Sequence, residues 1–168
     1  MTTTVLNNLN VRILQEGYGA EAWHGAEMKA ALADGSSDLA FWRPGKGRHN
    51  IAEIAVHHAY CVHSVRGRLA EKATEAFPLK GEDWFPVSDS APLSWKNIVA
   101  LVDTEHKKLA ALVADIDSGK TASKLSESER FALVVGITCH AVYHAGQIQL
   151  IKKLHARNPE ALNSQFFS

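Results

Sequence analysis

The sequence has little cysteine, no surplus of either charge and no long uninterrupted apolar run. Two cysteines in 168 residues, Cys61 and Cys139, exclude a disulfide framework, and the expected location is the reducing cytoplasm. Eighteen basic and eighteen acidic side chains give a formal charge of zero, which argues against a nucleic-acid-binding protein. No apolar run reaches about 18 residues, so no membrane-spanning helix is predicted. The first ten residues also lack the basic and apolar parts of a secretory signal.

Histidine, in contrast, is abundant, with nine residues in the chain. Imidazole changes its charge near neutral pH and is the commonest metal ligand, so the excess points to a metal or proton-transfer site. The length is that of a single domain, which we expect to span residues 1–168.

Apolar residues recur at helical spacing between polar breaks, and no period-2 alternation indicates strands. Asn50 followed by Glu53 predicts a capping box at one helix start, and Ser94 and Ser126 or Ser128 are candidate caps for two others. Residues 77–92 hold three prolines and are expected to form a long connection. The expected helices cover roughly residues 5–14, 26–33, 51–71, 95–117 and 128–154. The predicted fold is all-α, a four-helix bundle with a long crossover connection and one short extra helix.

Two histidines four residues apart stand on the last predicted helix. His140 and His144 share one helix face with mostly apolar residues, so both should face the core. Buried imidazoles need partners. A single divalent ion can accept both nitrogens, but a hydrogen-bonded pair is the alternative.

A third candidate ligand lies in the helix that follows Asn50, where His57 and His58 are adjacent. Helical periodicity places His58 near the centre of the apolar arc and His57 on its shoulder, so it favours His58 as the inward residue. Cys61 lies one turn after His57 and is a possible fourth, soft ligand, although small buried cysteines are common without a metal.

Two segments resemble the DinB/YfiT-like superfamily of metal-binding four-helix bundles. The first is Gly47–Ile54 followed by His57, and the second is Cys139–Ile148, which reads CHAVYHAGQI. The resemblance implies that His57, His140 and His144 bind one divalent metal ion. Relatives usually carry an aliphatic residue at the position of His58 and often a tryptophan at that of Cys61.

Three protein ligands with open positions are typical of a catalytic metal site. The resemblance includes enzymes that activate low-molecular-weight thiols, so we expect a metal-dependent enzyme of the thiol S-transferase or hydrolase type, with a small-molecule substrate and a homodimeric state. The metal expected is nickel, zinc, manganese or iron. One alternative is a non-catalytic, stress-associated metal-binding bundle; another is a plain helical interaction protein with incidental histidines.

Other polar and aromatic residues are mostly given structural roles. Glu53 is interpreted first as a capping carboxylate, and Gln147 either as a packing amide or as a contact to water or substrate. Packing roles are also predicted for Tyr143, Trp84 and Cys139. Solvent-exposed helix positions are predicted for His63, His106 and His155.

Overall fold

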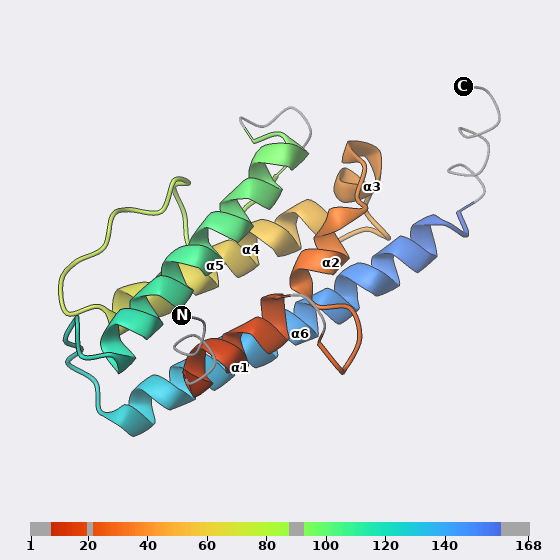
Figure 1. Ribbon diagram of the computed structural model, residues 1–168. Coiled ribbons are helices and arrows are strands. Elements are labelled where there is room, and N and C mark those ends of the chain that lie inside the picture. Colours follow the sequence, from red (N-terminus) through yellow and green to blue (C-terminus); the bar gives the residue numbers. More distant parts are fainter. Residues whose placement is uncertain (1–7, 20–21, 88–92, 159–168) are drawn as a thin grey trace.

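The computed structural model describes residues 8–19, 22–87 and 93–158, and this part of the chain is all-helical (Figure 1). No strand occurs within these ranges. The described helices are α1 (Leu9–Tyr18), α2 (Met28–Ala33), α3 (Ser37–Phe41), α4 (Ile51–Leu69), α5 (Trp95–Asp117) and α6 (Glu127–His155). The all-α prediction is confirmed.

Side-chain caps fix the starts of the long helices. Asn50 and Glu53 form the predicted capping box at α4, and Ser126 forms a second one with Glu129 at α6. Ser94 caps α5 by accepting a hydrogen bond from a backbone N–H in the first turn. The predicted start of the first helix at Val5 lies outside the described residues.

Helix α3 was not predicted. Its five residues follow Ser36, whose side chain caps the helix by accepting a hydrogen bond from the backbone N–H of Leu39. A helix this short shows too few turns for hydrophobic periodicity to reveal it.

The four longest helices pack side by side. α1 contacts α5 and α6, and α4 contacts the same two helices, while α2 lies against α6 and α3 against α4 (Figure 1). Gly17 allows α1 to approach α6 closely, because a Cβ at this position would lie only 2.9 Å from the backbone oxygen of Thr138. The helix contacts accommodate a four-helix bundle, with α2 and α3 as additions.

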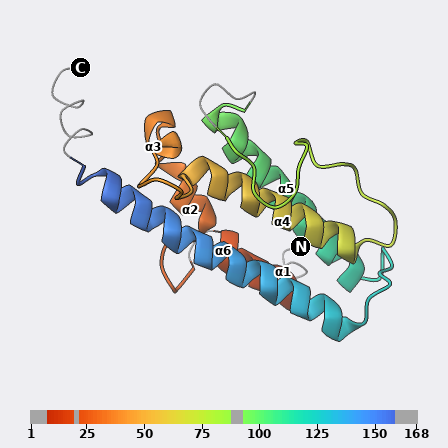
Figure 2. The same cartoon turned by 180° about the vertical axis from the view of Figure 1, so that it is seen from behind.

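The connection after α4 folds back along that helix before the chain reaches α5 (Figure 2). Its Phe77 and Phe85 contact the ring of Tyr60. Asp83 has a positive φ of 62°, an uncommon conformation for a residue other than glycine. This turn brings the backbone of Asp83 to His57, so the connection completes one wall of the site.

The apolar core consists of two separate clusters. One contains Met28, Ile51, Val56, Ile98 and Ile148, among others, and the second contains Leu14, Val62, Leu109, Val113 and Ile137. The boundary between the two clusters falls at His106 on α5 and at His140 on α6, and His58 on α4 lies next to it, between Val56 and Ala59 of the first cluster. A layer of histidines therefore crosses the interior.

By length and composition, α6 is apolar enough to cross a membrane. In the structure it instead packs against α1, α2 and α4 and carries His140 and His144 between the helices. This arrangement is consistent with a soluble protein.

Candidate metal centre

Three imidazoles from α4 and α6 converge on one point. The Nε2 atom of His140 lies 3.1 Å from Nε2 of His57 and 3.1 Å from Nε2 of His144. His57 and His144 are 6% and 3% exposed, and His140 is half-buried. The structure thus brings together the three residues that the sequence resemblance singled out as ligands.

The other ring nitrogen of each histidine has a partner of its own. Nδ1 of His57 donates to the backbone oxygen of Asp83 at 2.9 Å, and Nδ1 of His144 donates to Oε1 of Gln147 at 2.7 Å. Nδ1 of His140 lies 2.9 Å from Nδ1 of His58. Outer contacts of this kind fix the ring orientation of metal-binding histidines and leave Nε2 as the ligand atom.

The convergence suits a divalent cation. Nitrogen ligands at about 2.0–2.1 Å from one ion, with angles between octahedral and tetrahedral, stand about 2.9–3.4 Å from each other. The observed separations of 3.1 Å fall within that range. Acceptors at the Nδ1 atoms of His57 and His144 turn their Nε2 lone pairs toward His140, and a cation would satisfy all three.

Burial favours the neutral form of His140 and His144. Burial lowers the pKa of His140 to about 4, with further lowering by His144 and His57. Burial also lowers the pKa of His144, although the hydrogen bond to Gln147 partly opposes it. A neutral imidazole has a lone pair on one ring nitrogen, which is the form in which histidine binds a cation.

The structure accounts for the conflict between periodicity and resemblance in α4. All nine residues from Ile51 to Ala59 are buried, because the half-helix is covered by α3, α5, α6 and the connection. The expectation of a single inward face is therefore wrong here. His57 points to the converging Nε2 atoms, and His58 points into the interior, where it contacts His140 and His106.

Cys61 lies beside this cluster. Its Sγ is 3.8 Å from Nε2 of His57, and His57, Cys61 and Asp83 form a second possible ligand group. Burial, with a contribution from Asp83, raises the pKa of Cys61 to about 11. Because thiolate is the ligand form of cysteine, this environment disfavours Cys61 as a ligand relative to the three histidines.

An aromatic stack covers His57. Trp84 lies face to face with His57, with ring centroids 4.0 Å apart, and its other neighbour in the stack is His49 at 3.7 Å. Nδ1 of His49 donates to Glu53 at 2.9 Å, and Arg43 donates to the same carboxylate. Burial would raise the pKa of Glu53, but these hydrogen bonds outweigh it and lower the pKa. Glu53 therefore has the predicted capping role and supports the stack, while Trp84 belongs to the site and not only to packing.

A cavity of about 680 Å³ opens next to the histidines. His144 and Gln147 line it together with Trp84 and Tyr143, and Leu150 and Leu154 add apolar surface. A somewhat larger cavity of about 760 Å³ lies elsewhere, between α4, α5 and the connection, and no histidine lines it. Of the three converging histidines, His144 lines the first cavity, so this cavity reaches one edge of the cluster.

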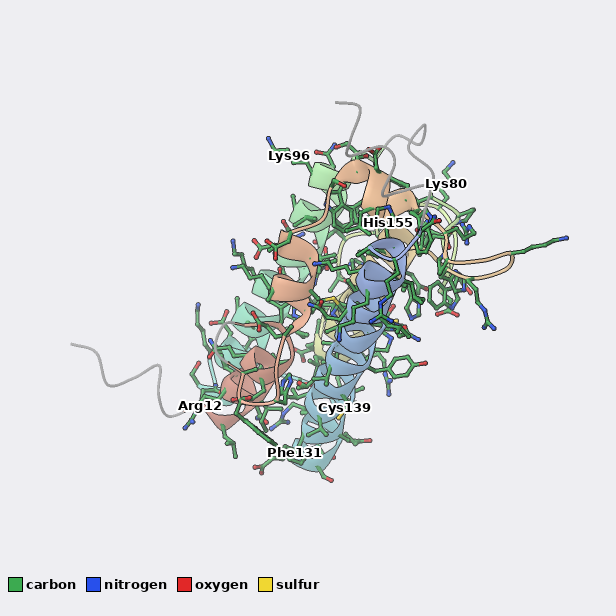
Figure 3. All side chains as sticks on the ribbon, turned by 90° about the vertical axis from the view of Figure 1, so that its right-hand side faces the viewer. Arg12, Lys80, Lys96, Phe131, Cys139 and His155 are labelled. Carbon is green, nitrogen blue, oxygen red and sulfur yellow. The ribbon has the colours of Figure 1, made fainter. Side chains whose placement is uncertain are left out.

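The structure contradicts the predicted environments of four residues, and one of them is Tyr143, which was expected to pack but is 63% exposed. His106 was expected in solvent but is 6% exposed, with Nε2 2.7 Å from Nε2 of His58. The periodicity could have revealed it, because His106 continues the apolar stripe four residues after Val102. His63 is part-buried beside Arg66 and Glu105. Cys139, expected to be packed, is exposed on α6 (Figure 3).

Gln147 has a role that the sequence did not suggest. It was expected to pack or to meet water or substrate, yet its Oε1 accepts the hydrogen bond from His144. The position of Gln147 one turn after His144 was the sequence feature that could have predicted this hydrogen bond.

Fold and site together define an all-α protein with a three-histidine cluster between two long helices, an arrangement consistent with metal binding. A family model of the DinB superfamily matches residues 22–148, and the chain belongs to this superfamily. No curated protein and no solved structure gave a significant match.

Proposed function

We propose that the protein binds one divalent metal ion through Nε2 of His57, His140 and His144. The observation that carries the proposal is the convergence of these three atoms, combined with partners at all three Nδ1 atoms. Membership of the DinB superfamily, which is typically metal-binding, supports it.

Metal content of the purified, untagged protein tests this proposal. We expect about one divalent ion per chain in the wild type, and a sharp loss in His57→Ala, His140→Ala and His144→Ala. His24→Ala is the matched control, because His24 is exposed and bonds only a backbone oxygen of α1. Unchanged metal content in all three site variants would refute the ligand assignment.

We further propose that the site is catalytic, with either a thiol S-transferase or a hydrolase activity in the cytoplasm. Three protein ligands leave positions open, and the adjoining cavity can admit a small substrate. A divalent cation held there would act as a Lewis acid and lower the pKa of a ligated water or thiol. Around it, Trp84 shields one face of His57 from solvent, and Gln147 holds His144 in orientation.

A cobalt- or nickel-substituted protein distinguishes the thiol activity from its alternatives. A thiol that binds the ion as thiolate should add a sulfur-to-metal charge-transfer band to the visible or near-ultraviolet spectrum. The Cys61→Ser variant is the required background, because the Sγ atom of Cys61 lies only 3.8 Å from Nε2 of His57. If that variant retains metal but shows no response to small thiols, hydrolysis or a non-catalytic metal site becomes the better assignment.

A further inference from the structure

A chain of hydrogen-bonded histidines extends from the candidate metal centre into the interior. His140 on α6 contacts His58 on α4 through the two Nδ1 atoms, 2.9 Å apart. His58 contacts His106 on α5 through the two Nε2 atoms, 2.7 Å apart. The ring of His106 stacks on Tyr18, with centroids 3.8 Å apart. Of the three chain histidines, only His140 is a proposed metal ligand.

The rings of His58 and His106 are buried, although burying an apolar side chain costs less free energy than burying an imidazole. His58 is 0% exposed and His106 is 6% exposed. Burial lowers the pKa of His58 well below its usual value and that of His106 to about 3, so both rings are neutral at pH 7. A neutral imidazole has one N–H and one lone pair. The two contacts can therefore be satisfied together only if every donor points in the same direction along the chain.

In the metal-free protein, the direction of the hydrogen bonds along the three linked histidines is set where the Nε2 atoms of His57, His140 and His144 meet. Asp83 accepts from Nδ1 of His57 and Gln147 accepts from Nδ1 of His144, which leaves a lone pair on Nε2 of both histidines. Nε2 of His140 lies 3.1 Å from each of these lone pairs. A proton on Nε2 of His140 satisfies both, and Nδ1 of His140 is then an acceptor.

It follows that His58 donates from Nδ1 to His140 in that state. The remaining lone pair of His58 is on Nε2, so His106 donates to it from Nε2. All donors point toward the candidate metal centre.

Metal ligation requires the opposite arrangement. His140 must then offer its Nε2 lone pair, so its proton is on Nδ1 and is donated to His58. His58 in turn donates from Nε2 to His106, whose proton moves to Nδ1.

We infer that metal binding at the His57–His140–His144 cluster reverses the hydrogen-bond direction along the buried chain of His140, His58 and His106. The proton balance is closed: one proton leaves Nε2 of His140 to solvent, and one passes from His58 to His140. A further proton passes from His106 to His58, and Nδ1 of His106 takes one from solvent. Each ring stays neutral throughout. His58 and His106 are therefore positioning residues that act through His140.

The inference depends on the proposed metal site, and one experiment separates the two. Nitrogen-15 spectra of labelled histidine at pH 7.5 show which nitrogen of each ring carries the proton. On adding one equivalent of zinc, we expect His58 to change from the Nδ1–H to the Nε2–H form and His106 from Nε2–H to Nδ1–H. His155, which is not one of the three linked histidines and contacts Trp42, should keep its tautomer.

Two outcomes overturn the inference in different ways. If the protein binds about one zinc ion while His58 and His106 keep their tautomers, the reversal is wrong and the metal site stands. If no zinc binds, the proposed function fails and the inference fails with it.

Variants at position 58 test the positioning role by metal affinity. In His58→Asn the amide oxygen can take the place of Nδ1 and accept from His140, whereas His58→Leu fills similar space without an acceptor. We expect zinc affinity to fall by about 10–100-fold in His58→Leu and to stay close to wild type in His58→Asn. Equal affinities in the two variants would contradict the role.

If His58→Leu does not fold, a variant of His106, the linked histidine farthest from the proposed metal site, still tests the inference. In His106→Gln the side-chain amide can either donate to or accept from Nε2 of His58. His58 should still change tautomer with zinc in this variant. If it keeps its tautomer, the proposed reversal of the hydrogen bonds is wrong.

Discussion

The ring of Trp84 lies parallel to that of His57, with an interplanar angle of 3° and centroids 4.0 Å apart. An indole this close to a metal ligand should sense the ion directly. We therefore expect nickel or cobalt to quench the tryptophan fluorescence of the protein, because open-shell ions quench at short range, while zinc leaves most of it.

Substitution of single tryptophans identifies the one whose fluorescence the ion quenches. Trp84→Phe keeps an aromatic ring over His57 and should lose most of the nickel-dependent quenching. Trp23→Phe is the control, because Trp23 is 90% exposed and its ring meets that of His24 edge to face. Quenching of the same size in Trp84→Phe and in the wild type would place the ion elsewhere.

The two cysteines should differ strongly in reactivity. With a pKa of about 11, only about one Cys61 in a thousand is thiolate at pH 8, whereas Cys139 is exposed. Alkylation with iodoacetamide followed by mass spectrometry should label Cys139 first and Cys61 much more slowly. Rapid labelling of Cys61 in a Cys139→Ser variant would show that its thiol is not held protonated by burial.

His106 should make the metal-free protein less stable in acid. Its pKa falls from 6.5 to about 3 through burial, so between these values the unfolded chain binds one more proton than the folded chain. The free energy of unfolding then decreases as the pH falls through this window, by up to about 1.4 kcal/mol per pH unit for one group. Urea denaturation at pH 6 and 4.5 should show a shallower pH dependence in His106→Gln. Parallel profiles for the two proteins would contradict this assignment.

A buried ion pair at the other end of α4 should be important for stability. Arg66 donates to Glu105 at 3.2 Å, and both side chains are under 10% exposed. Removing the cation leaves a buried carboxylate with weaker partners, so Arg66→Met should lower the free energy of unfolding by about 3 kcal/mol. Lys120→Met, which breaks the exposed pair with Asp115, should change it by less than about 1 kcal/mol. Similar effects of both substitutions in urea denaturation would refute the burial argument.

Much of the helical structure was accessible from the sequence, because caps and apolar periodicity are local signals. Asn50, Ser94 and Ser126 each begin a helix as predicted. Local signals did not reveal α3, which is too short to show a period.

The site was accessible only in part. The spacing of His140 and His144 follows from one helix, but their meeting with His57 depends on how α4 and α6 pack. Periodicity favoured His58 over His57 as the inward residue, but the start of α4 is buried on every side, so both histidines face the interior. The roles of Trp84 and Asp83 depend on the path of the connection after α4, for which the sequence contains no periodic signal.

X-ray absorption spectroscopy of the zinc-loaded wild-type protein tests the central claim most directly. It counts the atoms bound to the ion and separates nitrogen ligands near 2.0–2.1 Å from sulfur near 2.3 Å. The account predicts three imidazole nitrogens, with the remaining positions occupied by oxygen and with no sulfur. A sulfur ligand from Cys61, or fewer than three imidazoles, would contradict a metal centre formed by His57, His140 and His144.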